Sequence, residues 1–573
     1  MAMDEPTTSA AARQSATASQ PPAAERSSEA NVKETIESIL VAFILAFIFR
    51  AFIVEAFVIP TGSMAPTLMG AHVRYRCSDC GYRYQLNYPT GGEGEDVMIP
   101  ARAEQTFVTF CPNCGYRPPR RDPADPDNAA ASPPVHYGDR ILVLKYLYLL
   151  AEPQRWDVVV FKSPSEPERH DYTQNYIKRL VGKPGESVMI LDGDIYISTT
   201  GQELGDFQVQ TKPRKVQEAL WRIVHDSDYY PRGRDRTLTD RFGQPLIRGG
   251  RVEADPPYQH PWKQPPDEQG WQIDPQAGVY IFDNIDSAAA LYFDSDANPR
   301  KHAFTDWMAY NAGVNVHGAD TYDSSGYTPV NNVSDVKLRF FYERHEGDGP
   351  LRLELEKHGH TFTAEITPTQ ASLYHRLSDA PGALVQSVPI TVGRNRPMLI
   401  EFMNVDYQVT LRIDEQDVLQ TTREQYQPDL RALLRAYELR QRLPEPRVRI
   451  IGRQQRAAVR HLSLWRDVYY TNRDNRGMSP MLWASPEAFP QRIFQLGADE
   501  FFVCGDNSPV SGDSRFWERG IALPQEDLFV GAGRVPRRFM LGKAFFVYWP
   551  AGFRPMPGLP PIIPNFGDMR FIH

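Results

Sequence analysis

The N-terminal part of the chain changes abruptly from polar to apolar. Residues 1–31 are rich in Ala, Ser, Thr, Pro and Glu and contain almost no large apolar side chains, which predicts a disordered tail. Residues 36–59 are strongly apolar apart from Glu37, Arg50 and Glu55, and about 20 residues of helix cross a bilayer, so we expect one transmembrane helix at 32–56. Arg50 interrupts the run, and its side chain is expected to reach the membrane interface. The alternatives are a cleaved secretory signal peptide and a buried core helix.

Short runs that alternate between apolar and polar residues predict strands over the rest of the chain. One group of runs, bounded by Gly, Pro or charged turns, predicts strands at 141–145, 157–161, 176–181 and 188–197. A helical pattern follows Pro428. The expected fold class is therefore mainly β. In a second group the apolar side chains share one face, as in a β-sandwich: Val336, Leu338, Phe340 and Tyr342; Leu351, Leu353 and Leu355; and Tyr407, Val409, Leu411 and Ile413.

Composition narrows the classes of function. With 573 residues, 41% of them hydrophobic and 23% charged, the chain is globular and long enough for several domains. A net charge of −8 argues against nucleic acid as the main partner. Five cysteines are too few for a disulfide scaffold, and four of them form two CxxC pairs, which indicates a local site.

Three polar segments carry residues suited to chemistry. Ser63 follows a glycine in the segment PTGSMAPT, and a serine in such a loop is free to act as a nucleophile. Lys178 lies in NYIKRLVGKPG, where strand alternation places it beside apolar neighbours that would desolvate its amine. The third segment, GDNSPVSGDSR at 505–515, is unusually rich in hydrogen-bonding groups.

Together with YGDRILV at 137–143, these segments resemble type I signal peptidase, a bacterial serine protease family that uses a Ser-Lys dyad. The resemblance covers residues 33–70, 136–200 and 495–550. It implies a β-rich catalytic core after one N-terminal transmembrane helix. It also implies a single-pass protein of the bacterial cytoplasmic (inner) membrane with its catalytic domain on the extracytoplasmic side. The implied partners are the lipid bilayer and the signal peptides of exported preproteins, with small residues at substrate positions −1 and −3.

The resemblance assigns a role to each matching residue. Ser63 takes the place of the nucleophile, and Lys178 that of the general base. Thr61 matches a hydroxyl that joins the Ser63 amide in the oxyanion hole, and Ser511 matches the hydroxyl that orients the lysine. The residues matched to bracing of the site are Arg179, Asp506, Asp513 and Arg515. Those matched to shallow substrate pockets are Ile59, Pro60, Met64, Leu68, Tyr176 and Ile177.

The chemistry of the dyad makes its own demands. A lysine accepts a proton from serine only when it is neutral, so its pKa must fall from about 10.4. Apolar burial and the Ser511 hydroxyl are the available means. The side chain of Arg179 should point to the opposite face of the strand. No cofactor is needed for catalysis, and His136, which has no place in the mechanism, is predicted to be a surface residue.

Two CxxCGY motifs lie between the serine and lysine segments, at Cys77, Cys80, Cys111 and Cys114. Paired motifs of this kind are typical of a zinc ribbon, in which four thiolates bind one structural zinc ion. Two disulfides are the alternative in an oxidising compartment. Either arrangement is structural, because four cysteine ligands leave no open position on the metal.

A long insertion separates the lysine segment from the third motif. Its strand pattern is similar to a concanavalin- or laminin-G-like jelly roll, whose candidate ligands are a carbohydrate or a protein. His358 and His360 are predicted to lie in a solvated hairpin turn, and Cys504 to be a buried strand residue. The expected organisation is: disordered tail 1–31; transmembrane anchor 32–56; catalytic core 57–70, 136–200 and 491–573; zinc ribbon 71–118; linker 119–135; and sandwich-containing insertion 201–490.

Two other functions fit parts of this pattern. One is a membrane-tethered binding protein in which the jelly roll is active and the peptidase core is a scaffold. The other is a self-cleaving Ser-Lys peptidase of the repressor type. The presence of both Ser63 and Lys178 disfavours the first, and the apolar anchor together with the 505–515 motif disfavours the second.

Overall fold

The chain divides into two compact units, Met1–Ile53 and Val54–His573. Most of the predicted tail at 1–31 and of the predicted linker at 119–135 lies outside the described residues. A computed structural model describes residues 28–88, 99–100, 109–117, 133–164, 174–201, 203–238, 244–297, 303–313, 331–378, 380–439, 441–471, 494–517, 520–523, 528–552 and 563–573.

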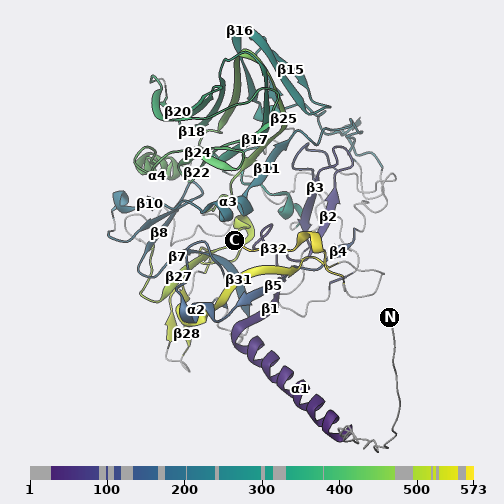
Figure 1. The fold of residues 1–573 in the computed structure, drawn as a ribbon, viewed down its shortest axis with the longest axis vertical. Coiled ribbons are helices and arrows are strands. Elements are labelled where there is room, and N and C mark those ends of the chain that lie inside the picture. The colour runs from purple at the N-terminus through teal and green to yellow at the C-terminus, as the bar shows by residue number, and fades with distance from the viewer. Residues whose placement is uncertain are drawn as a thin grey trace, which may run out of the picture. The chain divides into compact units, whose positions relative to one another are not determined.

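The first unit is built around one helix. Helix α1 (Ser28–Ile48) continues into a π-helical turn, η1 (Phe49–Ile53), and Figure 1 shows it as a single rod. No helix among the described residues is both long and apolar enough to cross a membrane. The next strand already begins at Val54, so the helical segment begins before the predicted residue 32 and ends before the predicted residue 56. Pairing of Val54 with Leu144 in a neighbouring strand accounts for this early end.

The second unit contains a mainly antiparallel sheet that joins three distant parts of the chain (Figure 1). The strands predicted at 141–145, 157–161 and 176–181 are confirmed as members of this sheet. Its buried face packs apolar side chains around Ile141, Val143 and Val160. In order across the sheet, the strands are β1 (Val54–Val58), β5 (Arg140–Leu144), β31 (Met540–Trp549), β6 (Val158–Lys162), β7 (Asn175–Gly182), β27 (Glu500–Cys504) and β30 (Val535–Pro536), with β32 (Arg570–Phe571) beside β31.

The single strand predicted at 188–197 is wrong, because the segment forms a hairpin. Strands β8 (Ser187–Leu191) and β9 (Asp194–Ser198) are joined by Asp192 and Gly193, which have positive φ angles of 51° and 84°. Both strands are entirely buried, so apolar side chains continue through the hairpin without marking its turn. Strands β10 (Gln208–Val209) and β26 (Phe494–Gln495) complete this four-stranded sheet.

A small three-stranded sheet carries the cysteine motifs. Strands β2 (His72–Arg76) and β3 (Arg83–Asn87) form a hairpin, and β4 (Val135–His136) pairs with β2. The cysteines pack with Tyr75, Tyr84 and Phe110 in a small core of their own. We call this part the ribbon.

The largest sheet has thirteen strands and lies where the sequence predicts a sandwich, and we keep the name sandwich for it. The alternation predicted for Val336 to Tyr342 and for Leu351 to Leu355 is confirmed, since these side chains are buried in one large core. The helix predicted after Pro428 is confirmed as α4 (Leu430–Glu438), capped by Asp429. The strands of this sheet are β11 (Arg222–Asp226), β14 (Trp262–Lys263), β15 (Trp271–Asp274), β16 (Val279–Phe293), β17 (Val336–Glu346), β18 (Leu351–Lys357), β19 (His360–Ile366), β20 (Gln370–Leu377), β21 (Ala383–Pro389), β22 (Met398–Val405), β23 (Gln408–Ile413), β24 (Gln416–Gln420) and β25 (Arg447–Arg466).

Short elements connect these sheets. Helix α3 (Arg214–Leu220) joins the four-stranded sheet to the sandwich, and the short helix η5 (Ala309–Gly313) contacts β3 of the ribbon. The remaining elements are α2 (Leu147–Leu150), η3 (Leu204–Asp206), β12 (Ile247–Arg248), β13 (Arg251–Val252), η4 (Ser295–Ala297), η7 (Ser508–Val510), β28 (Ile521–Leu523), β29 (Leu528–Val530), η9 (Arg537–Phe539) and η10 (Phe566–Asp568).

Candidate active site

The loop that carries Ser63 is fixed at both ends by Asp139. The Ile59 amide donates to the backbone oxygen of Asp139 at 2.9 Å, and the Met69 amide donates to its carboxylate at 3.0 Å. The Asp139 carboxylate also accepts from Arg570. A Cβ at Gly138 would lie only 1.8 Å from the Ile59 oxygen, so no larger residue fits this contact. The 137–143 motif therefore positions the Ser63 loop.

Lys178 meets Ser63 from the central strand β7. Its Nζ donates to the Ser63 Oγ at 2.9 Å and to the Ile177 backbone oxygen at 3.0 Å. The side chain is only 5% exposed, and its amine lies 5.3 Å from the centre of the Tyr176 ring. The structure thus brings together the two residues expected to form the dyad, across 115 residues of sequence.

The 505–515 turn supports the Ser63 loop from the other side. The Asn507 amide donates to the Ser63 backbone oxygen at 3.0 Å, and its Nδ2 donates to the Gly62 oxygen at 2.9 Å. Asn507 and Asn311 also exchange side-chain hydrogen bonds of 2.7 and 2.9 Å. Neither asparagine was predicted to belong to the site. The GDN motif was a signal for Asn507, whereas Asn311 lies in the insertion and had none.

The four residues matched to bracing form two fully buried ion pairs. Arg179 binds Asp506 through two hydrogen bonds of 2.7 Å, and its Nη1 donates to the Trp156 oxygen. The pair Arg515–Asp513 is also bidentate, at 2.8 and 2.6 Å. Bidentate geometry and backbone acceptors offset the cost of burying these charges. The Arg179–Asp506 pair holds the 505–515 turn against strand β7, and the Arg515–Asp513 pair lies within the turn itself.

Ser511 is buried beside this turn. It is 2% exposed, and its Oγ has no hydrogen-bond partner among the described residues. A Cβ at Gly505 would approach the Ser511 Oγ and the Ser63 backbone oxygen within 2.1 and 2.5 Å, so Gly505 lies between them. Thr61 is partly buried two residues before Ser63. The oxyanion role of Thr61 and the orienting role of Ser511 stay predictions.

The six residues matched to substrate pockets differ in burial. Met64 and Leu68 are completely buried and pack with Ile59 in the core of the sheet, where Ile177 also contacts them. Pro60, Tyr176 and Ile177 are only partly buried, so they offer surface to a ligand. Met64 and Leu68 lie beneath that surface and shape it by packing.

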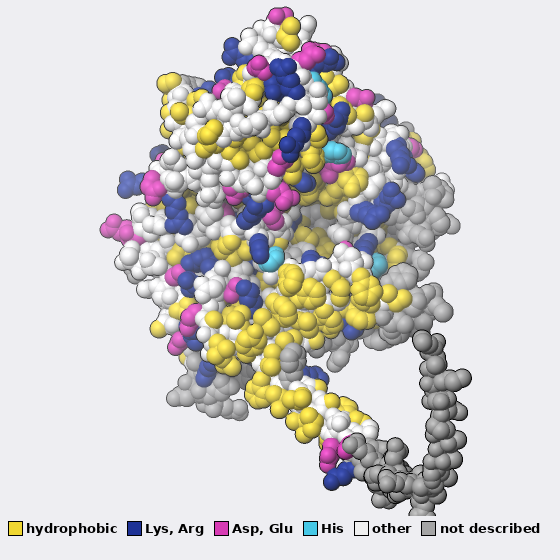
Figure 2. All heavy atoms as spheres, in the orientation of Figure 1, with side chains coloured by type: hydrophobic (Ala, Val, Ile, Leu, Met, Phe, Trp, Pro, Cys, Tyr) yellow, Lys and Arg dark blue, Asp and Glu magenta, His cyan; other side chains and the backbone are white. Residues whose placement is uncertain are grey.

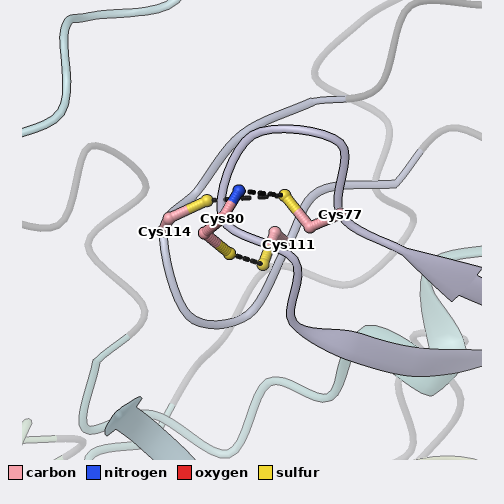
Figure 3. A group of neighbouring side chains, drawn as sticks. All are labelled: Cys77, Cys80, Cys111 and Cys114. Carbon is pink, nitrogen blue, oxygen red and sulfur yellow. Dashed lines mark hydrogen bonds between the residues drawn. The ribbon is translucent and has the colours of Figure 1, made fainter. Parts of the chain in front are cut away.

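The four cysteines of the two motifs converge on one point (Figure 3). The sulfur atoms of Cys77 and Cys114 are 3.7 Å apart, and those of Cys80 and Cys111 are 3.6 Å apart. A disulfide would require about 2.05 Å. Tetrahedral zinc with ligands at about 2.3 Å would place its sulfurs about 3.8 Å apart. The donor set therefore fits a zinc ion and does not form the alternative disulfides.

The structure also places three residues for which the sequence predicted no catalytic role. His136 is partly buried and stacks on His72 at 5.5 Å, so its prediction as a surface residue is wrong. His358 occupies the predicted hairpin turn but is not solvated, because its Nε2 lies 2.6 Å from Asp192 and its side chain is only 11% exposed. Cys504 is buried in strand β27, as predicted.

Comparison with known proteins matches this arrangement to a family. The family described as signal peptidase, peptidase S26, matches residues 32–80, 122–244 and 410–549, more than half of the chain. These ranges contain Ser63, Lys178 and the 505–515 turn. The chain belongs to the peptidase S26 family.

Individual curated relatives are similar over shorter stretches. A probable signal peptidase I-2 of Synechocystis is 27% identical over 15% of this chain and 38% of its own length. Signal peptidase I of Rickettsia typhi is 25% identical over 29% of this chain and 44% of its own length. Thylakoidal processing peptidase 1 of Arabidopsis thaliana is 27% identical over 18% of this chain and 31% of its own. The chain spans less than half the length of each of these relatives.

Solved structures show only weak similarity. The carbohydrate-binding module CBM66 of Bacillus subtilis has a TM-score of 0.22 at 7% identity, covering 36% of this chain and 94% of the module. The transglycosylase Crh5 also has a TM-score of 0.22, at 13% identity, covering 38% of this chain and 84% of the enzyme. These scores are too low to assign a fold or a ligand to the insertion.

Proposed function

We propose that the chain is a signal peptidase I, a serine endopeptidase that removes N-terminal signal peptides from exported preproteins. The observation that carries the proposal is the 2.9 Å contact between the Lys178 amine and the Ser63 hydroxyl. A buried amine at hydrogen-bond distance from a loop serine is the geometry of a nucleophile beside its general base. Membership of the peptidase S26 family supports the same reading.

The mechanism follows from the positions of these groups. The neutral Lys178 amine takes the proton of Ser63 while the Ser63 Oγ attacks the carbonyl carbon of the scissile bond. The Ser63 amide and the Thr61 hydroxyl stabilise the resulting oxyanion. Protonated Lys178 then gives its proton to the leaving amine, and a water activated by the same lysine hydrolyses the acyl-enzyme. The orienting role of the Ser511 hydroxyl is proposed from its match to the family motif, since this hydroxyl has no hydrogen-bond partner among the described residues.

Substrate preference follows from the surface beside the dyad. Pro60, Tyr176 and Ile177 present limited apolar surface, and fully packed side chains lie beneath them. Because closely packed side chains leave no depth beneath this surface, it accepts only small uncharged residues. We therefore infer selection of small residues at substrate positions −1 and −3.

Exposed apolar side chains of the second unit suggest a membrane location. Leu149 and Leu150 of α2 are 82% and 81% exposed, and Phe571 of β32 is 65% exposed; both elements contact strand β31. Figure 2 shows hydrophobic side chains gathered over the lower face of this unit. We infer that this surface and the apolar residues of α1 attach the protein to a lipid bilayer, on the extracytoplasmic side of the bacterial inner membrane.

The ribbon is proposed to bind one structural zinc ion through its four cysteines. The sulfur separations support this proposal. Polar contacts also join both CxxC motifs to residues 226–236. Asn113 donates to the backbone oxygens of Asp226 and Tyr229, and Asp79 binds Arg236. A carbohydrate or protein ligand for the sandwich stays a prediction.

Cleavage of a model preprotein tests the function directly. The purified full chain should convert it into two products whose masses place the cut after a signal peptide with Ala at −1 and −3. Ser63→Ala and Lys178→Ala should each abolish cleavage with unchanged circular dichroism, because the dyad acts as a unit. Lys183→Ala, on the same segment but outside the site, is the control. Activity retained in either dyad variant would refute the mechanism, and cleavage of the enzyme alone would favour a self-cleaving peptidase.

A further inference from the structure

A cavity lies on the face of the Ser63 loop that packs against the insertion. The loop residues Met64 and Leu68 pack into the core sheet, whereas Ala65 and Met69 pack on Met308 and Tyr310 of the insertion. Beyond this contact lies a pocket of about 170 Å³, lined by the ribbon, by Pro66 of the Ser63 loop and by the sandwich strands β11 and β25. Three separate parts of the chain therefore build one cavity.

The pocket is coupled directly to the Ser63 loop. A Cβ at Gly62 would lie 2.5 Å from the Tyr310 ring, so this ring rests on the backbone next to Ser63. The following residue, Asn311, binds Asn507, which in turn holds the Ser63 backbone oxygen. A ligand in the pocket would contact residues that position the candidate nucleophile.

The walls of the pocket are mostly aromatic. Phe110 of the ribbon stacks on Trp307 of the insertion with ring centres 4.2 Å apart and planes inclined by 9°. Tyr84, Trp221 and Tyr310 line other parts of the cavity. Such walls favour an apolar or aromatic body over a hydrated sugar or a bare ion.

The charged side chains that line the pocket among the described residues are all positive. Its described lining includes Arg83, Arg222 and Arg466 and contains no Asp or Glu. Arg222 is only 8% exposed, and its Nε and Nη2 have no hydrogen-bond partner among the described residues. Its Nη1 makes two long contacts, 3.3 Å to the Trp221 oxygen and 3.4 Å to the Ala219 oxygen.

A buried guanidinium with free donors is costly unless an anion binds it. The protein's own nearby carboxylates do not fill this role. Asp506 is bound by Arg179, and Asp467 is bound by Lys212. Arg466, the neighbour of Arg222 across the strand pair, has its guanidinium on the backbone oxygens of Asp467 and Trp307. Arg222 is therefore the buried arginine of the pocket lining whose Nε and Nη2 donors have no hydrogen-bond partner, and no salt bridge joins it to a carboxylate among the described residues.

We propose that this pocket binds a carboxylate carried on a short apolar or aromatic body, with the Arg222 guanidinium as its anchor. A guanidinium matches a carboxylate through two parallel hydrogen bonds, and the ring walls hold the body. Two sources fit this chemistry. One is an acidic side chain of the preprotein on the mature side of the scissile bond, which rests on the proposed function. The other is a free aryl carboxylate.

Tryptophan fluorescence tests the site without any need for catalysis. The full-length protein is titrated with phenylacetate and, in parallel, with the neutral isostere phenylacetamide. We expect saturable quenching by phenylacetate and at least about tenfold weaker binding of the amide, because only the anion pairs with Arg222. Arg222→Gln should lose the preference for the anion. Arg248→Gln, an exposed arginine on a remote hairpin, should keep it. The comparison of the two probes on the unaltered protein remains decisive even if Arg222→Gln does not fold.

A second arm distinguishes the sources. Preproteins with Glu at each of positions +1 to +6 are compared with the matching Gln substrates by kcat/KM. A Glu preference of about tenfold at one position, lost in Arg222→Gln, assigns the pocket to the preprotein. Phenylacetate binding without any Glu preference assigns it to a free carboxylate. Equal binding of phenylacetate and phenylacetamide together with equal rates for Glu and Gln substrates would overturn the proposal. If no preprotein is cut at all, the proposed function fails while the fluorescence result still decides the site.

Discussion

Thr61 is the residue whose contribution to catalysis can be isolated most cleanly. Thr61→Val keeps the shape of the side chain and removes only the hydroxyl. Removing one oxyanion donor costs about 10²–10³ in kcat, so we expect a loss of that order with little change in KM. Steady-state kinetics on a preprotein provide the measurement, with Thr67→Val on the same loop as the control. An unchanged kcat would remove Thr61 from the oxyanion hole.

The residues of the dyad could be predicted from the sequence, but several of their supports could not. Ser63 and Lys178 lie in motifs that resemble a family, and the structure places them 2.9 Å apart. Asn311 belongs to the insertion, where no motif marks it, and it reaches the site only because η5 packs against the ribbon and the Ser63 loop. Nothing in the sequence marked Arg222 either. Its proposed role depends on its having no salt-bridge partner among the described residues, and only the structure shows this.

At the scale of elements, we predict that the ribbon depends on a zinc ion for its stability. Its core is small, so zinc ligation should supply much of its folding free energy. We expect one zinc per chain by mass spectrometry. Chelation should make the ribbon the first region cut by protease, while preprotein cleavage survives in part because the dyad uses no metal. Cys77→Ser should imitate chelation, and Cys504→Ser should not. A metal-free protein with only one titratable thiol would contradict this prediction.

The sequence predicts elements well where one face is buried and poorly where burial is uniform. Strands β17 and β18 alternate between buried and less buried positions, so their periodicity was visible. Strands β8 and β9 are buried on both faces, and the turn at Asp192 and Gly193 was hidden in one apolar run. The start of β1 at Val54 was hidden in the same way, because the apolar helix continues directly into an apolar strand.

The sandwich is joined to the catalytic core by buried charges. Lys357 binds Asp335 within the sandwich and Asp194 of strand β9 at 3.5 Å. Lys212 similarly binds Asp406 and, at 2.7 Å, Asp467. All of these groups are at most 8% exposed, so each carboxylate depends on a lysine for its counter-charge.

Removing one lysine should therefore loosen the whole second unit. Lys357→Met leaves two buried carboxylates uncompensated, and breaking such a pair costs about 3–5 kcal/mol of the free energy of unfolding. Urea denaturation measures this loss. Adding Asp335→Asn to the variant should restore part of the stability, and Lys263→Met, whose side chain is 37% exposed, should cost far less. A Lys357→Met protein as stable as the unaltered one would show that the network does not hold the two parts together.

Two histidines that are buried in their neutral form, His72 and His225, lower the stability of the folded protein in acid. Burial lowers the pKa of His72 to about 4, and the Arg74 guanidinium lowers it further, although the Gly70 oxygen, which accepts from Nδ1, opposes the shift. Burial also lowers the pKa of His225 to about 3. Since the unfolded chain has a histidine pKa of about 6.5, it binds protons that the folded chain excludes between these values.

These two histidines should therefore cost no stability above about pH 6.5, and their contribution should lower the free energy of unfolding as the pH drops toward 4, by about 3 kcal/mol from His72 alone. His72→Asn keeps a donor toward Gly70 without a titrating ring, so it should flatten the pH dependence of the unfolding free energy between pH 6.5 and 4. Equal slopes in the His72→Asn and unaltered proteins would mean that His72 is protonated without unfolding.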